Sequence, residues 1–309
     1  MLTNTTHSSA LSGWRLEFEL TGSCQLECVH CYAESGPNGD HGTMTAQDWK
    51  TAISEAALLG VSHVQFIGGE PTMHPQFGEL LRHAIDCGLP VEVFSNLVHV
   101  RADWWDMLVS PGVSLATSYY SDRASEHAAV TGREGSHART RANIAQAVRR
   151  GIPVRAGIID VLDGQRVEQA QAELLALGVS SIGIDRLRGV GRGARTRPDV
   201  SQLCGGCGRG QAAVSPTGDV WPCVLSRWMR AGNVKERPLA EILTGQAWKD
   251  LVDSIPAPRG GPQCNPDKED CRPKKDGNDC HPSEKPACNP RFCGPELSPK
   301  NPPKDPKKK

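Results

Sequence analysis

Short runs of alternating apolar and polar residues recur between residues 15 and 184, and stretches of helical periodicity separate them. In the first run, residues 15–20, the apolar residues Leu16, Phe18 and Leu20 alternate with charged ones, as in a β-strand. The same reasoning predicts five further strands, at residues 63–67, 90–94, 113–117, 153–159 and 181–184.

Helical spacing of apolar residues fills the gaps between these runs. Residues 45–59 open with Thr45 as a capping residue and carry Trp49, Ile53 and Ala56 on one face. Four more helices are predicted at residues 76–87, 102–109, 139–150 and 167–177. Glycines stand where left-handed helix ends are expected, at Gly60, Gly88, Gly151 and Gly178.

Six strand–helix repeats predict an α/β fold with a parallel sheet and right-handed crossovers. Six units are too few for an eightfold barrel, so we expect an open, partial (β/α)6 barrel over residues 1–197. Architectures of this kind place their ligands at the carboxyl ends of the strands.

The amino-acid composition of the chain changes from residue 198. Cysteine, glycine and proline become frequent, and one helix-like stretch remains, at residues 239–252. We expect residues 198–295 to form a C-terminal cysteine-rich, mostly irregular cluster-binding domain. Its end has too few apolar residues to fold without metal. Residues 296–309, rich in proline and lysine, are expected to be a disordered tail.

Charge and cysteine content narrow the class of protein. The chain has 35 basic and 35 acidic residues, so no net field favours nucleic acid or an anionic membrane. It shows no signal peptide and no membrane-spanning run, which favours the cytoplasm. Twelve cysteines in a reducing compartment are more typical of metal or cluster ligands than of disulfides.

Three of these cysteines follow the first predicted strand. Cys24, Cys28 and Cys31 form C-x3-C-x2-C, a spacing that suits a [4Fe–4S] cluster held by one tight loop. Three thiolates leave one iron open to a small chelating molecule. A tetrahedral zinc site would need a fourth ligand, for which His30 is the available neighbour.

The spacing and its position resemble the signature of the radical S-adenosylmethionine (SAM) superfamily. The resemblance implies that the open iron binds SAM, that one electron cleaves it to methionine and a 5′-deoxyadenosyl radical, and that this radical abstracts a substrate hydrogen atom. It also implies a reducing partner such as a flavodoxin or ferredoxin. The family usually has an aromatic residue before the third cysteine; here His30 takes that place and is expected to pack against adenine.

A second motif follows the second predicted strand. Gly68 and Gly69 let a ligand approach the backbone, and Glu70, before Pro71, offers an acceptor to an ammonium group. This run resembles the family motif that holds the SAM amine, although alone it is an ordinary strand-to-helix loop.

Two later segments resemble parts of the same family. Ser95 and Asn96, after the third strand, resemble the segment near the SAM ribose or carboxylate; the alternative is a polar turn. Arg186 and the turn at residues 191–193 resemble an arginine and glycine run of relatives; the alternative is a solvated loop.

The remaining cysteines lie in the C-terminal third, apart from Cys87, which fits a helix's apolar face. Cys204, Cys207 and Cys223, with the surrounding glycines, resemble the start of a SPASM or twitch extension, which holds auxiliary clusters; half a zinc ribbon is the alternative. Five tail cysteines each precede a proline by two positions: Cys264, Cys271, Cys280, Cys288 and Cys293. These eight thiolates suit one or two auxiliary iron–sulfur clusters.

The resemblance leaves the substrate open. Enzymes with such extensions mostly modify ribosomally made peptides, by crosslinking, epimerisation or oxidation, and a minority act on sugars, aminocyclitols or other small molecules. Only about 14 residues precede the first strand, so we expect a leader-binding domain to be a separate protein or absent, which weakens the peptide hypothesis without removing it. A zinc-stabilised binding module is the hypothesis from another class. In an epimerase, Tyr119, Tyr120 or a tail cysteine is a candidate hydrogen-atom donor.

Overall fold

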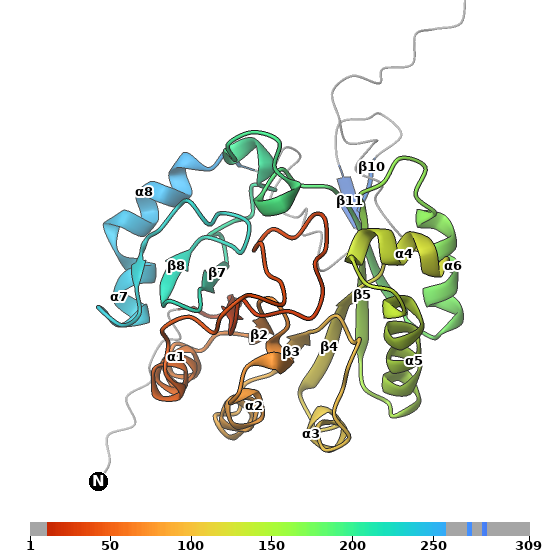
Figure 1. Cartoon of the computed structure of the whole chain (residues 1–309). Coiled ribbons are helices and arrows are strands. Elements are labelled where there is room, and N and C mark those ends of the chain that lie inside the picture. Colours follow the sequence, from red (N-terminus) through yellow and green to blue (C-terminus); the bar gives the residue numbers. More distant parts are fainter. Residues whose placement is uncertain (1–10, 258–270, 274–279, 283–309) are drawn as a thin grey trace, which may run out of the picture.

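A computed structural model describes residues 11–257, 271–273 and 280–282 (Figure 1). The predicted tail at 296–309 and Cys264, Cys288 and Cys293 lie outside the described residues. Two short strands, β10 (Cys271–Pro273) and β11 (Cys280–Pro282), pair antiparallel, but the side chains of their cysteines also lie outside the description.

The six predicted strands are confirmed within two residues at each end. They are β1 (Arg15–Glu19), β2 (His63–Ile67), β3 (Val91–Phe94), β4 (Val113–Ser118), β5 (Val154–Asp160) and β6 (Ser181–Arg186). All six are parallel and lie in the spatial order in which the chain visits them. The sheet curves without closing, which confirms the partial barrel (Figure 1).

The cysteine-rich region extends the same sheet. Strand β7 (Gln211–Val214) pairs with β1 in parallel, at the edge opposite β6, and β8 (Asp219–Trp221) and β9 (Gly232–Asn233) follow antiparallel. The sequence pattern had not indicated these strands. The domain boundary at residue 197 remains a prediction, and the pairing of β7 with β1 carries the sheet across it.

Five predicted helices cover the outer face of the sheet: α1 (Ala46–Leu58), α2 (Phe77–Asp86), α3 (Trp104–Leu108), α5 (Ser136–Arg149) and α6 (Val167–Ala176) (Figure 1). Thr45 caps α1 as predicted, because its hydroxyl accepts from the Asp48 backbone N–H and the Asp48 carboxylate accepts from the Thr45 N–H. The four predicted helix-end glycines all have positive φ, between 72° and 91°.

Two helical predictions need correction. Helix α4 (Ala124–Thr131) was missed, because its buried residues include the polar His127 and Thr131 beside Ala128 and Val130, so it shows no clear apolar stripe. The predicted helix at 239–252 is two helices, α7 (Leu239–Thr244) and α8 (Gln246–Ser254). Gly245 lies between them with an extended backbone, ψ 164°, so the helix cannot continue through it.

The two faces of strand β1 meet different surroundings. Leu16 and Phe18 are fully buried in the core under the outer helices. Arg15, Glu17 and Glu19 alternate with them and are also buried, so the inner face of the sheet is polar. No helix among the described residues is long and apolar enough to cross a membrane.

Candidate active site

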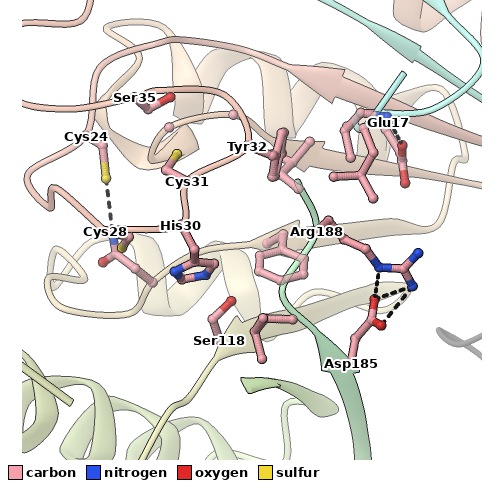
Figure 2. Close-up of a pocket in the computed structure, with 18 of the residues that line it drawn as sticks. Glu17, Cys24, Cys28, His30, Cys31, Tyr32, Ser35, Ser118, Asp185 and Arg188 are labelled. Carbon is pink, nitrogen blue, oxygen red and sulfur yellow. Dashed lines mark hydrogen bonds and ion pairs between the residues drawn. The ribbon is translucent and has the colours of Figure 1, made fainter. Parts of the chain in front are cut away.

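A cavity of about 310 Å³ lies on the inner face of the sheet. Both sets of described cysteines line it: Cys24, Cys28, Cys31, Cys204, Cys207 and Cys223. Figure 2 shows the first three on one loop, with the ion pair of Asp185 and Arg188 across the cavity. The fold thus brings together cysteines that are almost 200 positions apart.

The loop that carries the first three cysteines is held on two sides. On one side, α4 accepts hydrogen bonds from it: Glu27 N–H donates to the Thr131 carbonyl at 3.1 Å and Val29 N–H to the Val130 carbonyl at 3.0 Å. On the other side, Arg192 donates from Nε to the Cys28 carbonyl at 2.8 Å and from Nη2 to the Ser35 carbonyl at 2.7 Å. We refer to residues 20–41 as the cysteine loop.

The Arg192 turn also fits closely against the cysteine loop. Gly191 has φ +56°, and a Cβ there would lie 2.4 Å from the carbonyl oxygens of Cys31 and Tyr32. From the sequence alone, this segment was notable only for its resemblance to an arginine and glycine run of relatives. The structure shows that Arg192 binds loop carbonyls, whereas Arg186 lines the cavity further along.

The sulfur of Cys24 has N–H donors directed at it. The Leu26 backbone nitrogen lies 3.4 Å from this sulfur and the Asn96 amide nitrogen 3.6 Å from it. Such donors stabilise a thiolate. Burial, and then the Glu70 carboxylate, raise the pKa of Cys24 to about 12, and burial and Cys31 do the same for Cys28.

These features fit an iron–sulfur cluster. Within the described ranges, no three His, Cys, Asp or Glu side chains converge on a point that would hold a single metal ion. The donor set itself suits the cluster, because Cys24, Cys28 and Cys31 bring three sulfur ligands from one loop to the cavity. Two residues of the lining, Ser35 and His30, have buried polar atoms, Oγ and Nδ1, that make no hydrogen bond among the described residues.

The backbone of the cysteine loop packs directly against Gly68 and Gly69, the two glycines of the second motif. A Cβ at Gly68 would lie 2.6 Å from the Thr21 carbonyl oxygen, and one at Gly69 2.3 Å from that of Ser23. Gly69 N–H donates to the Thr21 carbonyl at 2.7 Å. The motif therefore sets the start of the cysteine loop against the end of β2, and both glycines line the cavity.

Glu70 connects its turn to the end of β3. Its buried carboxylate accepts from the Thr72 hydroxyl at 2.6 Å, the Thr72 N–H at 3.2 Å and the Asn96 N–H at 2.9 Å. Burial raises the pKa of Glu70 above its ordinary value. The cavity lining includes Asn96 and does not include Glu70, Pro71 or Ser95. Direct contact of these three with SAM remains a prediction.

The two tyrosines after β4 differ in position. Tyr120 lines the cavity beside His30, with ring centres 5.2 Å apart and 3.3 Å from its hydroxyl to His30 Nε2. Tyr119 is fully buried outside the lining, where its hydroxyl donates to Glu173 at 2.7 Å. Of the two, Tyr120 has access to a bound molecule.

The second set of cysteines forms a compact group. Cys207 is 1% exposed, and its sulfur lies 2.8 Å from that of Cys223. Hydrogen bonds with Cys204 and Cys223, and then burial, raise the pKa of Cys207. Leu203, Met229 and Ile255 pack around them.

One buried ion pair joins this region to the barrel. Arg227, between β8 and β9, donates to both carboxylate oxygens of Glu19, at 2.7 and 2.6 Å, and lies 4.4 Å over the Trp221 ring. Glu19 is 1% exposed. Sequence reasoning missed this pair and Arg192, because neither belongs to a local motif.

An open parallel sheet with a cysteine loop after its first strand defines a barrel that binds an iron–sulfur cluster. The chain belongs to the radical SAM superfamily, whose family model matches residues 18–175. A second model, for the SPASM iron–sulfur cluster-binding domain, matches residues 204–272. The cofactors of the protein are therefore a [4Fe–4S] cluster, SAM and auxiliary iron–sulfur clusters.

Known proteins similar to this chain fall in the same class. A PqqA peptide cyclase of Rhodopseudomonas palustris is 31% identical over 122 residues, 39% of this chain and 32% of that protein. An AdoMet-dependent heme synthase of Methanosarcina barkeri is 32% identical over 140 residues, 45% of this chain and 39% of that protein. The chain thus spans about a third of the length of these relatives.

Streptococcus suis SuiB, solved with S-adenosylmethionine, shares the fold at a TM-score of 0.65. It is 15% identical, over 77% of this chain and 67% of that one.

Proposed function

We propose that this protein is a radical SAM enzyme that modifies a ribosomally made peptide by crosslinking, epimerisation or oxidation. The observation that carries the proposal is the single cavity lined by Cys24, Cys28 and Cys31 and also by Cys204, Cys207 and Cys223. The relative named as a PqqA peptide cyclase supports a peptide substrate.

The cluster, when reduced, supplies the electron that cleaves SAM to methionine and a 5′-deoxyadenosyl radical. The chain's own residues would position the participants. Cys24, Cys28 and Cys31 would hold the cluster, while Arg192 and α4 fix the loop that carries them. Asn96 would donate to the Cys24 sulfur, and the Gly68–Gly69 turn would set the loop against β2.

The second group of cysteines would hold an auxiliary cluster at the same cavity. Cys204, Cys207 and Cys223 would supply three thiolates, and the tail cysteines would complete one or two clusters. Closing a crosslink after hydrogen abstraction releases one further electron and one proton from the substrate. The auxiliary cluster would supply one-electron redox chemistry beside the cavity. Of the two tyrosines after β4, Tyr120 lines the cavity and would return a hydrogen atom in an epimerisation.

A reducing partner, such as a flavodoxin or ferredoxin, would supply the first electron, and a separate protein would bind the peptide's leader. None of the seven cysteines within residues 11–257 forms a disulfide, which suits a reducing compartment such as the cytoplasm.

The test is product analysis under anaerobic conditions. The reconstituted enzyme is incubated with SAM, a reductant and short peptides encoded beside its gene, in deuterated solvent. A peptide mass changed by loss of hydrogen or gain of deuterium supports the proposal. 5′-Deoxyadenosine formed with a sugar or tetrapyrrole but with no peptide would replace it by the small-molecule alternative, which the heme synthase relative supports.

A further inference from the structure

One buried histidine of the cavity wall has a role that no motif indicated. His127, on α4, is 1% exposed and lines the cavity. Its ring packs among Tyr119, Tyr120 and His137, with centres 5.3 to 5.5 Å away. This packing fixes the plane of the imidazole ring.

A chain of hydroxyl groups fixes the ring's tautomer. The Thr131 hydroxyl donates its one proton to the His127 carbonyl at 2.9 Å, so it must accept from Ser136 Oγ, 2.8 Å away. Ser136 has then used its own proton and must accept from His127 Nδ1, 3.1 Å away. Nδ1 therefore carries the hydrogen, and Nε2 presents a lone pair.

That lone pair finds no partner among the residues that the structure describes. His127 Nε2 is buried and makes no hydrogen bond among the described residues. Burial lowers the pKa of His127 to about 4, so the ring is neutral at physiological pH. A buried acceptor left without a donor is costly, and nearly all such groups in native structures are paired with protein, water or a bound molecule.

The position of α4 indicates which ligand this is. Thr131 and Val130, on the turn after His127, accept hydrogen bonds from the cysteine loop. Tyr120 lies between His127 and His30, the neighbour of Cys31. A molecule that chelates a cluster on this loop by its methionyl end must place its adenosyl end within the same cavity. The adenosyl group has an amino group and two hydroxyls as donors.

We propose that His127 Nε2 accepts a hydrogen bond from the adenosyl group of SAM, from its amino group or a ribose hydroxyl. The inference rests on the proposed function, because it assumes that SAM binds in this cavity. Ser136 and Thr131 act as positioning residues that keep the hydrogen on Nδ1 and leave Nε2 as an acceptor.

Two substitutions of His127 separate its two nitrogens. His127→Asn keeps a donor near the Nδ1 position, for Ser136, and removes the acceptor. His127→Gln keeps an acceptor oxygen near the Nε2 position. The SAM dissociation constant is measured by anaerobic calorimetry on cluster-loaded protein with matched iron content. We expect roughly three- to tenfold weaker binding for Asn, the range that one hydrogen bond gives, and recovery of most of it for Gln.

SAM analogues identify the donor. Three analogues are compared, lacking the adenine amino group, the 2′-hydroxyl or the 3′-hydroxyl. One of them should bind the wild-type protein more weakly and lose nothing further in His127→Asn, as expected for two changes to one interaction. Additive losses for all three, or an unchanged SAM dissociation constant in the Asn variant, would overturn the inference.

Different results would refute the proposed function and the role of His127. A wild-type protein that holds its clusters and binds no SAM would refute the proposed function. A wild-type protein that binds SAM as tightly as its His127→Asn variant would refute only the role of His127.

Discussion

The ion pair between Glu19 and Arg227 gives the sharpest prediction about stability. Glu19 ends β1, directly before the cysteine loop, and Arg227 belongs to the cysteine-rich region, so the pair ties the two groups of cysteines together. Burial raises the pKa of Glu19, and Arg227 opposes this shift. Replacing Arg227 by methionine would leave a carboxylate that is 1% exposed without its cation.

The expected cost follows from this burial. Removing one partner of a buried pair typically costs about 3–5 kcal/mol, because the other charge remains desolvated. Loss of the stacking on Trp221 adds about 0.5–1 kcal/mol. Arg230→Met is the matched control, because Arg230 pairs with Asp219 and Glu236 but is half exposed, and it should cost at most about 1 kcal/mol.

Anaerobic urea unfolding followed by tryptophan fluorescence measures both variants. The double variant Glu19→Gln with Arg227→Met should recover a large part of the loss, since it removes the unpaired charge. Equal losses for Arg227→Met and Arg230→Met, or no recovery in the double variant, would refute the reasoning.

Four further predictions concern the site. Replacing Cys24, Cys28 and Cys31 together by alanine should abolish SAM cleavage while retaining auxiliary iron, measured by iron and sulfide content; loss of all iron would count against the assignment. Gly69→Ala should lower the iron content and reduce the free energy of unfolding by more than about 2 kcal/mol, because its Cβ meets the Ser23 carbonyl. Gly135→Ala is the control: its Cβ meets open space at φ +74°, so thermal unfolding should show a loss of about 1 kcal/mol. Glu70→Ala should weaken SAM binding more than cluster content, with an unchanged dissociation constant as the contrary result. Burial and then His41 lower the pKa of His74 to about 4. The folded protein therefore holds a neutral ring, and the stability that depends on it is present above pH 6.5 and is lost as the pH falls towards 4. In unfolding measured across this range, the His74→Gln variant should lose on the order of 1–2 kcal/mol less stability than the wild-type protein.

The barrel could be predicted from the sequence because its signals are local. Each of the strands β1 to β6 has its own apolar run, and each glycine helix end lies beside the helix it closes. Helix α4 was missed because its buried face carries His127 and Thr131, whose burial depends on hydrogen bonds that periodicity does not show. Strand β7 was missed because it is short and pairs with a strand about 195 positions away.

The residues of the site also differ in whether a local sequence signal indicates them. The cysteine loop and the glycine turn are contiguous motifs, and the structure places them at one cavity. Arg192, Arg227 and His127 act through partners distant in sequence or through a hydroxyl chain, so no spacing indicates them. The reason for Gly68 and Gly69 was also hidden, because the backbone that approaches them is the protein's own.

We propose that the cysteine loop holds a cluster that cleaves SAM. Anaerobic reconstitution with iron and sulfide, followed by addition of SAM and a reductant and quantification of 5′-deoxyadenosine, tests this role. We predict absorbance near ~400 nm from thiolate-ligated clusters and formation of 5′-deoxyadenosine that depends on the reductant. Protein that carried no labile sulfide and left SAM intact would contradict the account.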